Sequence, residues 1–265
     1  MTTVQAVYEL LDERAPFRMQ EPWDNSGLLV GRRSAPVERI LTCLDITPET
    51  IVEAAELGCQ LIVSHHPVIF DPVKRAEDGD YTGKRLLLLA EHHIAAICCH
   101  TCLDACPGGV NDVLAELCGL TDVGQLEQMG VDGQGRPYGI GRVGRLSASE
   151  SLADYLQRLK QTLHPNGLRY YDAGRPVQRV AVGGGSCGSM LELAVKAGCD
   201  TFVTADLKYD HFLVAKDYGI NLIDAGHYPT ENPVMQRVTE WLQEAFPDVE
   251  VHPTRLHREA LSYTM

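Results

Sequence analysis

Two stretches of the chain repeat the same order of apolar and polar segments. Residues 37–66 (VERILTCLDITPETIVEAAELGCQLIVSHH) and 177–206 (VQRVAVGGGSCGSMLELAVKAGCDTFVTAD) align without a gap at an offset of 140 residues, with six identities. Each stretch reads as a strand, a loop, a short amphipathic helix, a Gly-Cys pair and a second strand. Units of this kind favour parallel strands joined by a right-handed crossover. The pattern predicts an α/β fold made of two related lobes that arose by internal duplication.

The predicted helices carry recognisable end signals. In the first copy Thr47 is a suitable N-cap, Pro48 suits the first helical position, and Gly58 lies where a left-handed residue ends a helix. In the second copy we expect a serine, Ser186 or Ser189, to cap the helix and Gly198 to end it.

A further apolar strand follows each copy, in residues 92–101 and 217–227. The Gly-rich stretch 129–146 indicates a break and a hairpin. An amphipathic helix is expected over about 232–246 and a terminal strand over about 248–256. The expected division is a first lobe of residues 1–125 plus 232–265 and a second lobe of residues 126–231.

Charge and composition exclude several classes of function. The formal net charge is −13 and the isoelectric point about 5.2, so nucleic acid is an unlikely partner. No apolar run reaches membrane-spanning length, and the N-terminus does not resemble a signal peptide. We therefore expect a cytoplasmic globular protein without a membrane partner.

Nine cysteines are scattered along the chain, several of them in apolar strands. Free cysteine in such a position behaves as a small hydrophobic residue, so we do not expect a disulfide framework. Cys99 and Cys102 have the spacing of half a zinc knuckle, but a second pair with suitable spacing is missing from the sequence.

Polar side chains collect where the predicted strands end. Ligands of open α/β sheets bind at the carboxyl ends of the strands. Histidines and carboxylates at matching positions of two related units are the usual ligands of divalent metals. The residues at these positions are His65, His66, His100, Thr101, Asp104, Asp206, His227 and Glu231.

The spacing of these residues favours two ions rather than one. Neighbouring residues of a straight strand point to opposite faces, so His65 and His66 would reach two neighbouring ions from the strand end. Thr230 is a plausible N-cap that would place Glu231 in a first helical turn. A carboxylate can bridge two cations and an imidazole cannot, so Glu231 is the natural shared ligand. A pair of ions would polarise a substrate and activate water.

The chain resembles a known family, the Nif-three-like proteins, through an ordered set of motifs. These are WDNSGLLVG (23–31), SHHPVIF (64–70), HTCLDACPGGVND (100–112), VAVGGGSCGS (180–189), TADLKYDH (204–211) and DAGHYPTE (224–231). Members of this family are named GTP cyclohydrolase 1 type 2 homologues or dinuclear-metal-centre hexameric proteins. The resemblance implies two α/β lobes, a dinuclear metal site in the cleft between them and a toroidal homohexamer.

The resemblance also implies a ligand set. His66 and Asp104 would hold one ion, His65 and His227 the other, and Glu231 both. The chain departs from the family pattern at Cys102, Ala205 and Asp210, where the family usually has Asn, Gly and His. None of these departures removes an implied ligand, but they leave the roles of neighbouring side chains and the substrate open.

The glycine loop of residues 183–188 has three interpretations. Gly183, Gly185 and Gly188 fit a GxGxxG pattern with Asp206 about twenty residues later, which is typical of dinucleotide binding. The repeat partner LDITPE has no glycine, which argues against that function. A backbone nest for phosphate or another anion and a tight strand-to-helix turn are the alternatives.

The remaining candidates are weaker. His100 is the one candidate for a catalytic role, with a structural hydrogen bond as the alternative. Asp24 and Asn25 read first as a turn, with a position facing the cleft as the alternative. Asp45 is either a helix cap or a side chain that supports a metal ligand. We expect His164, His252 and His257 at the surface, and His92 and His93 precede a strand, at the wrong end of the sheet.

The functional hypothesis is a dinuclear metal-dependent hydrolase acting on a small phosphate-containing, nucleotide-like substrate. By resemblance, the reaction is that of GTP cyclohydrolase, from GTP to formate and a dihydroneopterin phosphate. The alternative is a non-catalytic hexameric scaffold that binds or handles metal. The ions would be two per subunit, and mixed nitrogen and oxygen ligands suit zinc, manganese, iron, cobalt or nickel.

Overall fold

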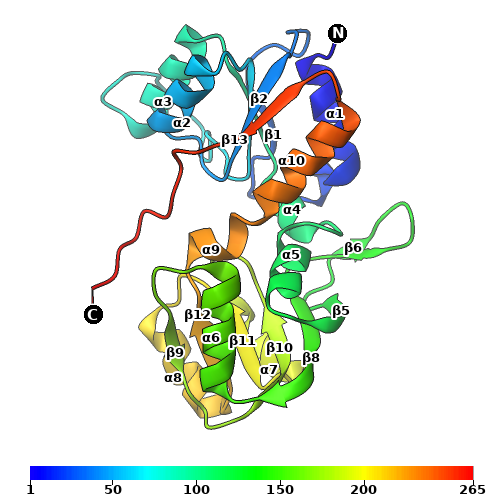
Figure 1. Ribbon diagram of the computed structural model, residues 1–265, viewed down its shortest axis with the longest axis vertical. Helices are drawn as coiled ribbons and strands as arrows, with labels where there is room; N and C mark the ends of the chain where they lie inside the picture. The colour runs from blue at the N-terminus through cyan, green and yellow to red at the C-terminus, as the bar shows by residue number, and fades with distance from the viewer. Residues whose placement is uncertain (265) are drawn as a thin grey trace. The chain divides into compact units, whose positions relative to one another are not determined.

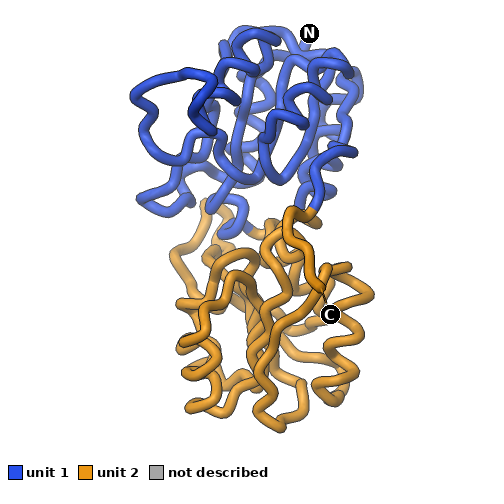
Figure 2. The backbone as a smooth tube through the Cα atoms, turned by 90° about the vertical axis from the view of Figure 1, so that its left-hand side faces the viewer, with its two compact units in different colours: residues 1–106, 234–258 blue, residues 107–233, 259–265 orange. Residues whose placement is uncertain are grey.

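Two β-sheets with parallel centres organise the chain in the computed structural model, which describes residues 1–264. Figure 2 shows the two compact units to which they belong. Unit 1 contains Met1–Cys106 and Val234–Arg258, and unit 2 contains Pro107–Pro233 and the chain from Glu259 onward. Of the helices in the described chain, none is both long and apolar enough to cross a membrane.

Unit 1 contains a five-stranded sheet in the order β1-β4-β3-β2-β13. Figure 1 labels its strands β1, β2 and β13. The strands are β1 (Gly27–Val30), β2 (Arg39–Cys43), β3 (Leu61–Ser64), β4 (Ala95–Cys98) and β13 (Glu250–Pro253), and only β1 runs antiparallel to its neighbour. The helices α2 (Pro48–Glu56) and α3 (Tyr81–Glu91) cover one face, while α1 (Val4–Arg14) and α10 (Val234–Ala245) lie on the other. The helix expected over 232–246 and the strand expected over 248–256 are therefore present as α10 and β13.

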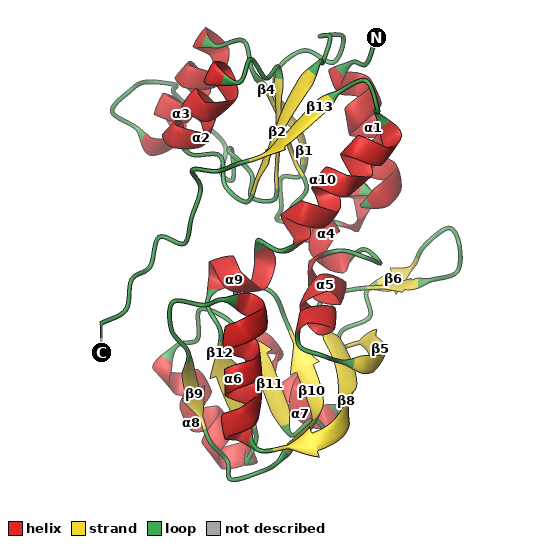
Figure 3. Cartoon of the chain, viewed as in Figure 1, coloured by secondary structure: helices red, strands yellow, loops and turns green. Residues whose placement is uncertain are grey.

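Unit 2 is a six-stranded sheet in the order β5-β8-β10-β11-β12-β9. Its strands are β5 (Thr121–Gln125), β8 (Arg142–Glu150), β9 (Arg169–Tyr171), β10 (Val177–Val182), β11 (Thr201–Thr204) and β12 (Asn221–Asp224), of which β10, β11 and β12 are parallel. One face of the sheet packs against α5 (Val110–Leu117) and α6 (Leu152–Leu163), and the other packs against α7 (Leu191–Lys196) and α8 (Tyr209–Tyr218). Figure 3 shows this layered arrangement and the separate hairpin of β6 (Gly130–Val131) and β7 (Pro137–Tyr138), in the stretch where a hairpin was expected.

The unit boundaries differ from the expected division at residues 125/126 and 231/232. Residues 107–125 belong to unit 2, because α5 packs against its core and β5 pairs with β8. A hairpin is a visible break in a sequence, but it does not have to coincide with the point where tertiary contacts change.

The two units share a strand topology. In unit 1 the strands β2, β3 and β4 are parallel neighbours, and β1, which precedes them, pairs antiparallel with β4. In unit 2 the strands β10, β11 and β12 have the same relation, and β9 pairs antiparallel with β12. This common order supports the proposed internal duplication.

Local capping explains the start of α2 but not that of α7. The Thr47 hydroxyl accepts a hydrogen bond from Thr50 N, and the Thr50 hydroxyl accepts one from Thr47 N. Pro48 occupies the first turn. The expected serine cap of the second copy is wrong. A short 3-10 turn, Gly188–Met190, precedes α7, whose N-cap Met190 makes no side-chain cap bond.

Candidate metal centre

Unit 1 brings three histidines together at one edge of its sheet. His65 and His66 follow β3, and His100 follows the neighbouring parallel strand β4, so the same edge presents all three. One ligand nitrogen from each ring lies within 4.8 Å of the others, and the His65 ring is completely buried. The strand ends thus position these side chains as the sequence predicted.

Each of these rings is fixed through Nδ1 by a hydrogen-bond acceptor. A carbonyl or an ionised carboxylate can only accept, so Nδ1 carries the proton and a neutral ring keeps its lone pair on Nε2. This is how proteins usually orient metal-ligating histidines. The contacts are His65 Nδ1 to Cys99 O at 2.8 Å, His66 Nδ1 to Asp45 Oδ1 at 2.8 Å and His100 Nδ1 to Asp24 Oδ1 at 2.7 Å.

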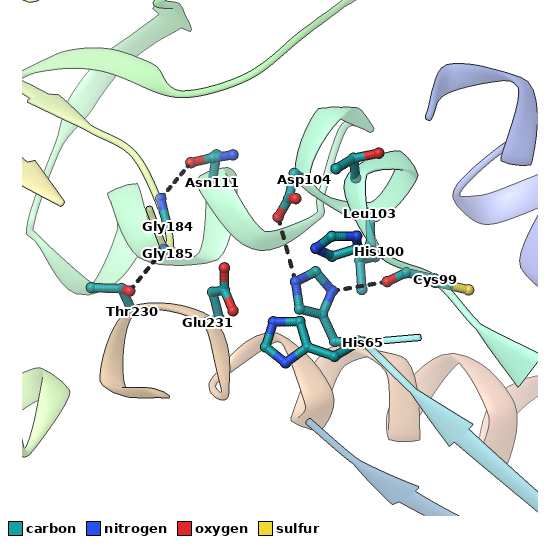
Figure 4. Close-up of polar contacts among 12 residues, drawn as sticks. His65, Cys99, His100, Leu103, Asp104, Asn111, Gly184, Gly185, Thr230 and Glu231 are labelled. Carbon is teal, nitrogen blue, oxygen red and sulfur yellow. Dashed lines mark hydrogen bonds and ion pairs between the residues drawn. The ribbon is translucent and has the colours of Figure 1, made fainter. Parts of the chain in front are cut away.

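Asp104 adds a carboxylate to this group. It lies in the short helix α4 (Thr101–Ala105), directly after His100, and is nine-tenths buried. Its Oδ1 is 3.7 Å from Nε2 of His65, the ring nitrogen that does not face Cys99 (Figure 4). Unit 1 therefore holds His65, His66 and Asp104, all three expected ligands of the first lobe, beside His100.

Asp45 connects the His66 ring to the C-terminal tail of unit 1. Its second oxygen accepts a hydrogen bond from His257 Nε2 at 2.8 Å. Burial raises the pKa of Asp45, but the bonds to His257 and His66 outweigh burial and hold it well below its ordinary value. The tail reaches this position because Glu53 binds Thr254 and Arg255. The expectation of a surface position for His257 was wrong: only 11% of its side chain is exposed.

Asp24 is buried beneath His100 and accepts several hydrogen bonds. They come from His100 Nδ1, from Thr101 N at 3.0 Å and from Thr101 Oγ1 at 2.5 Å. Burial raises the pKa of Asp24, but the bonds from His100 and Thr101 outweigh it and hold the pKa well below the ordinary range. The sequence suggested a turn at this position first, with a side chain facing the site as the alternative.

We expect Asp24 to make the metal-free protein sensitive to acid. Because its folded pKa lies below the unfolded value of about 4, its contribution is complete above that pH and is lost as pH falls through the folded pKa. Below about pH 4 the wild type should lose about 1.4 kcal/mol per pH unit more than Asp24→Asn. Urea unfolding in chelator between pH 3 and 6 checks this. Parallel loss in both proteins would contradict it.

Unit 2 contributes His227 and Glu231 from α9 (His227–Glu231), a single turn after β12. His227 Nε2 lies 2.8 Å from Glu231 Oε2, and Nδ1 lies 2.7 Å from Asp206 Oδ2. Burial lowers the pKa of His227, but the bonds to Asp206 and Glu231 outweigh it and raise the pKa to about 11. In the absence of a cation, a proton thus occupies the ring between two carboxylates.

The role expected of Thr230 was wrong. The N-cap of α9 is Gly226, with φ +86°, so Thr230 lies inside the turn and Glu231 ends it. Thr230 Oγ1 accepts a hydrogen bond from Gly185 N at 3.0 Å and donates to Gly226 O at 2.9 Å. The position of Glu231 therefore depends on packing against the glycine loop and not on the dipole of a helix N-terminus.

The glycine loop uses its amide groups within unit 2. Gly184 N donates to Asn111 Oδ1 at 3.0 Å, and Figure 4 shows this bond beside the one from Gly185 to Thr230. Gly183 N and Cys187 N bind Val203 O and Thr204 Oγ1. These bonds favour the tight turn over an anion nest, and α7, with only six residues, does not favour dinucleotide binding.

Close approach explains the glycine at position 185. A Cβ there would lie 2.0 Å from Glu231 Oε1, and the backbone has φ +62°, which disfavours other residues. The absence of a side chain at position 185 thus lets the carboxylate of Glu231 lie against the backbone of the glycine loop.

The cysteines form no second candidate site. All nine are free thiols, and eight are buried. Burial raises the pKa of Cys43 well above its ordinary value and that of Cys118 to about 12, which keeps these thiols protonated. Cys102 is packed beside Cys99, where its hydrogen bond is the main reason that the pKa of Cys99 is raised. Asp210 is exposed in the first turn of α8.

The fold and these side chains define a two-unit α/β protein with histidine and carboxylate groups suited to a metal ion. The chain belongs to the Duf34/NIF3 (NGG1p interacting factor 3) family, whose model matches residues 2–259.

Named relatives support the same assignment. A "GTP cyclohydrolase 1 type 2 homolog" of Clostridium perfringens is 32% identical over 239 residues, 90% of each chain. A "GTP cyclohydrolase 1 type 2" of Helicobacter pylori is 31% identical over 91% of this chain and 92% of its own. The crystal structure of a Bacillus cereus protein related to NIF3 has the same fold, with a TM-score of 0.93, 23% identity and coverage of 100% of this chain and 99% of that one.

Proposed function

We propose that the protein is a dinuclear metal-dependent hydrolase of a small nucleotide-like substrate, with GTP as the first candidate. The observation that carries the proposal is the shared setting of His65, His66 and His227. Each ring is held at Nδ1 by an acceptor, so Nε2 is the nitrogen that would bind a cation. The arrangement is usual for metal-ligating histidines, and here it recurs at three implied ligands.

The residues present fit a divalent metal. The set joins imidazole nitrogens with carboxylate oxygens, which suits zinc, manganese, iron, cobalt or nickel. The proposed ligands are His65, His66 and Asp104 of unit 1 with His227 and Glu231 of unit 2. The bound ions would supply Lewis acidity, charge neutralisation for phosphate and activation of water.

Surrounding side chains and a backbone carbonyl hold the ligands in position. Asp45 and Cys99 O fix the two adjacent rings, and Asp206 fixes His227. His227 must lose its raised-pKa proton before it can bind a cation, so loading of the site releases protons. His100, oriented by Asp24, stands beside the ligands as the candidate for proton transfer.

The reaction proposed is that of a cyclohydrolase, because two relatives carry that name. GTP would be hydrolysed to formate and a dihydroneopterin phosphate. By the family resemblance we also propose a homohexamer, with a sedimentation mass six times the subunit mass of 29.2 kDa.

The test compares metal content with turnover in His66→Ala and Glu231→Ala. We expect about two ions per wild-type subunit by elemental analysis and metal-dependent release of formate from GTP. Both variants should lose metal and turnover. His92→Ala is the matched control, because His92 is exposed and precedes β4 at the opposite edge of the sheet, and it should behave as wild type.

Two outcomes decide against the proposal. Full turnover by chelated protein would show that metal is not required. Stoichiometric metal without turnover on a panel of nucleotides would favour the metal-binding scaffold instead.

A further inference from the structure

Trp23 and Phe70 of unit 1 form a pair of neighbouring aromatic side chains that are in contact with solvent. Trp23 is 59% exposed and Phe70 is 49% exposed, although apolar rings of this size are usually buried. Their ring centroids are 5.9 Å apart, with 49° between the ring planes. We call this pair the aromatic platform.

The aromatic platform adjoins the histidine group of the same unit. The His100 ring centroid lies 6.0 Å from that of Trp23 and 6.1 Å from that of Phe70. The same His100 ring lies 5.3 Å from His65 and 5.5 Å from His66. A flat molecule on the platform would therefore lie next to the rings assigned to the metal.

Hydrogen bonds hold the two chain segments of the platform together. Asn25 Nδ2 donates to Ile69 O at 2.6 Å, which ties the segment after Trp23 to the one before Phe70. Ser26 Oγ accepts a hydrogen bond from His100 N at 3.0 Å, and the carboxylate of Asp24 binds both His100 and Thr101. The backbone under both rings is thus fixed before a ligand arrives, which lowers the entropy cost of binding.

We propose that Trp23 and Phe70 bind the planar base of the substrate by stacking. Any nucleobase has a π-face that stacks on aromatic side chains, whereas a phosphate group gains nothing from such a surface. The proposal deepens the proposed function and rests on it for the choice of a nucleotide. It assigns the base to the aromatic platform and leaves the phosphates to other groups.

The experiment measures binding rather than turnover. Guanosine, GTP and inorganic triphosphate are titrated calorimetrically into metal-loaded wild type, Trp23→Leu and Phe70→Leu. Each variant should bind guanosine and GTP about tenfold or more weakly and should bind triphosphate as wild type does. Trp23→Tyr should restore most of the affinity, because tyrosine keeps a stacking face.

Tyr218→Leu provides the matched control. Tyr218 is 50% exposed at the last residue of α8 and should not affect base binding. Guanosine should also quench wild-type fluorescence and not that of Trp23→Phe, since the second tryptophan, Trp241, is buried. Unfolding curves of the variants test whether the fold is retained.

The outcomes separate this proposal from the proposed function. Three outcomes would contradict base stacking on the aromatic platform. The first is wild-type affinity for guanosine and GTP in Trp23→Leu and Phe70→Leu, and the second is an equal loss of affinity for triphosphate. The third is failure of the wild type to bind guanosine and GTP. GTP that binds through Trp23, with no turnover of GTP or of the nucleotide panel, would overturn the hydrolase and leave the platform standing.

Discussion

Replacement of Gly185 by alanine is expected to destabilise the protein by about 2–5 kcal/mol and to lower its metal content. The added Cβ would lie 2.0 Å from Glu231 Oε1 and 3.2 Å from His227 Nε2, and the backbone φ of +62° adds its own strain. Relief of the clash requires Glu231 to move, and Glu231 is the proposed shared ligand. Urea unfolding and elemental analysis of the purified variant measure the two effects.

Gly198→Ala separates backbone strain from the clash. Gly198 has φ +74°, but apart from Gly198 and its two neighbours in the chain, no atom of the described residues lies within 4 Å of the point that an added methyl group would occupy. The variant should lose about 1–2 kcal/mol from the left-handed conformation alone and keep its metal. Equal stability loss and equal metal content in the two variants would show that Gly185 does not make room for Glu231.

Replacement of Arg142 by methionine is expected to destabilise the protein by about 3–5 kcal/mol, because it leaves a carboxylate without its cation. The Arg142 side chain is 1% exposed and donates to the Asp112 carboxylate, to Gln125 Oε1 and to the carbonyls of Gly139 and Gly141. It thereby joins α5, the edge strand β5 and the start of β8. Urea unfolding at neutral pH measures the loss.

Two further variants test the cause of that loss. Arg142→Met combined with Asp112→Asn should recover part of the stability, since the unpaired charge is then gone. Arg136→Met is the control, because Arg136 is 55% exposed in its pair with Asp132 and should change stability little. A loss as small as that of Arg136→Met would show that the buried pair contributes no more than a surface pair.

Local signals were enough to predict much of the fold. The α/β class, the cap at Thr47 and the closing elements α10 and β13 follow from periodicity and end signals that lie within about a dozen residues of one another. The placement of His65, His66 and Asp104 was also predictable. Neighbouring parallel strands end at one edge, so residues that follow two such strands meet there.

The errors arose where a contact between distant segments decides the structure. The serines near α7 were expected to cap it, but a 3-10 turn comes first, and Thr230 bonds to Gly185 from inside α9. The partner of His66 is Asp45, and Asp45 also binds His257, more than two hundred residues later in the chain. The strand-end position of Asp45 allowed a supporting role, but no periodicity in a single sequence signals its pairing with His66 and His257.

The contact between Asp45 and His257 gives the end of the chain an influence on a proposed metal ligand. A protein shortened before His257 would retain every proposed metal ligand, yet Asp45 would lose the second of the two rings between which it is now held. The His66 imidazole would then be oriented by a carboxylate that no longer has the hydrogen bond from His257. Trimming of the last residues by a protease would in this way alter the metal affinity of a site whose ligands it never touches.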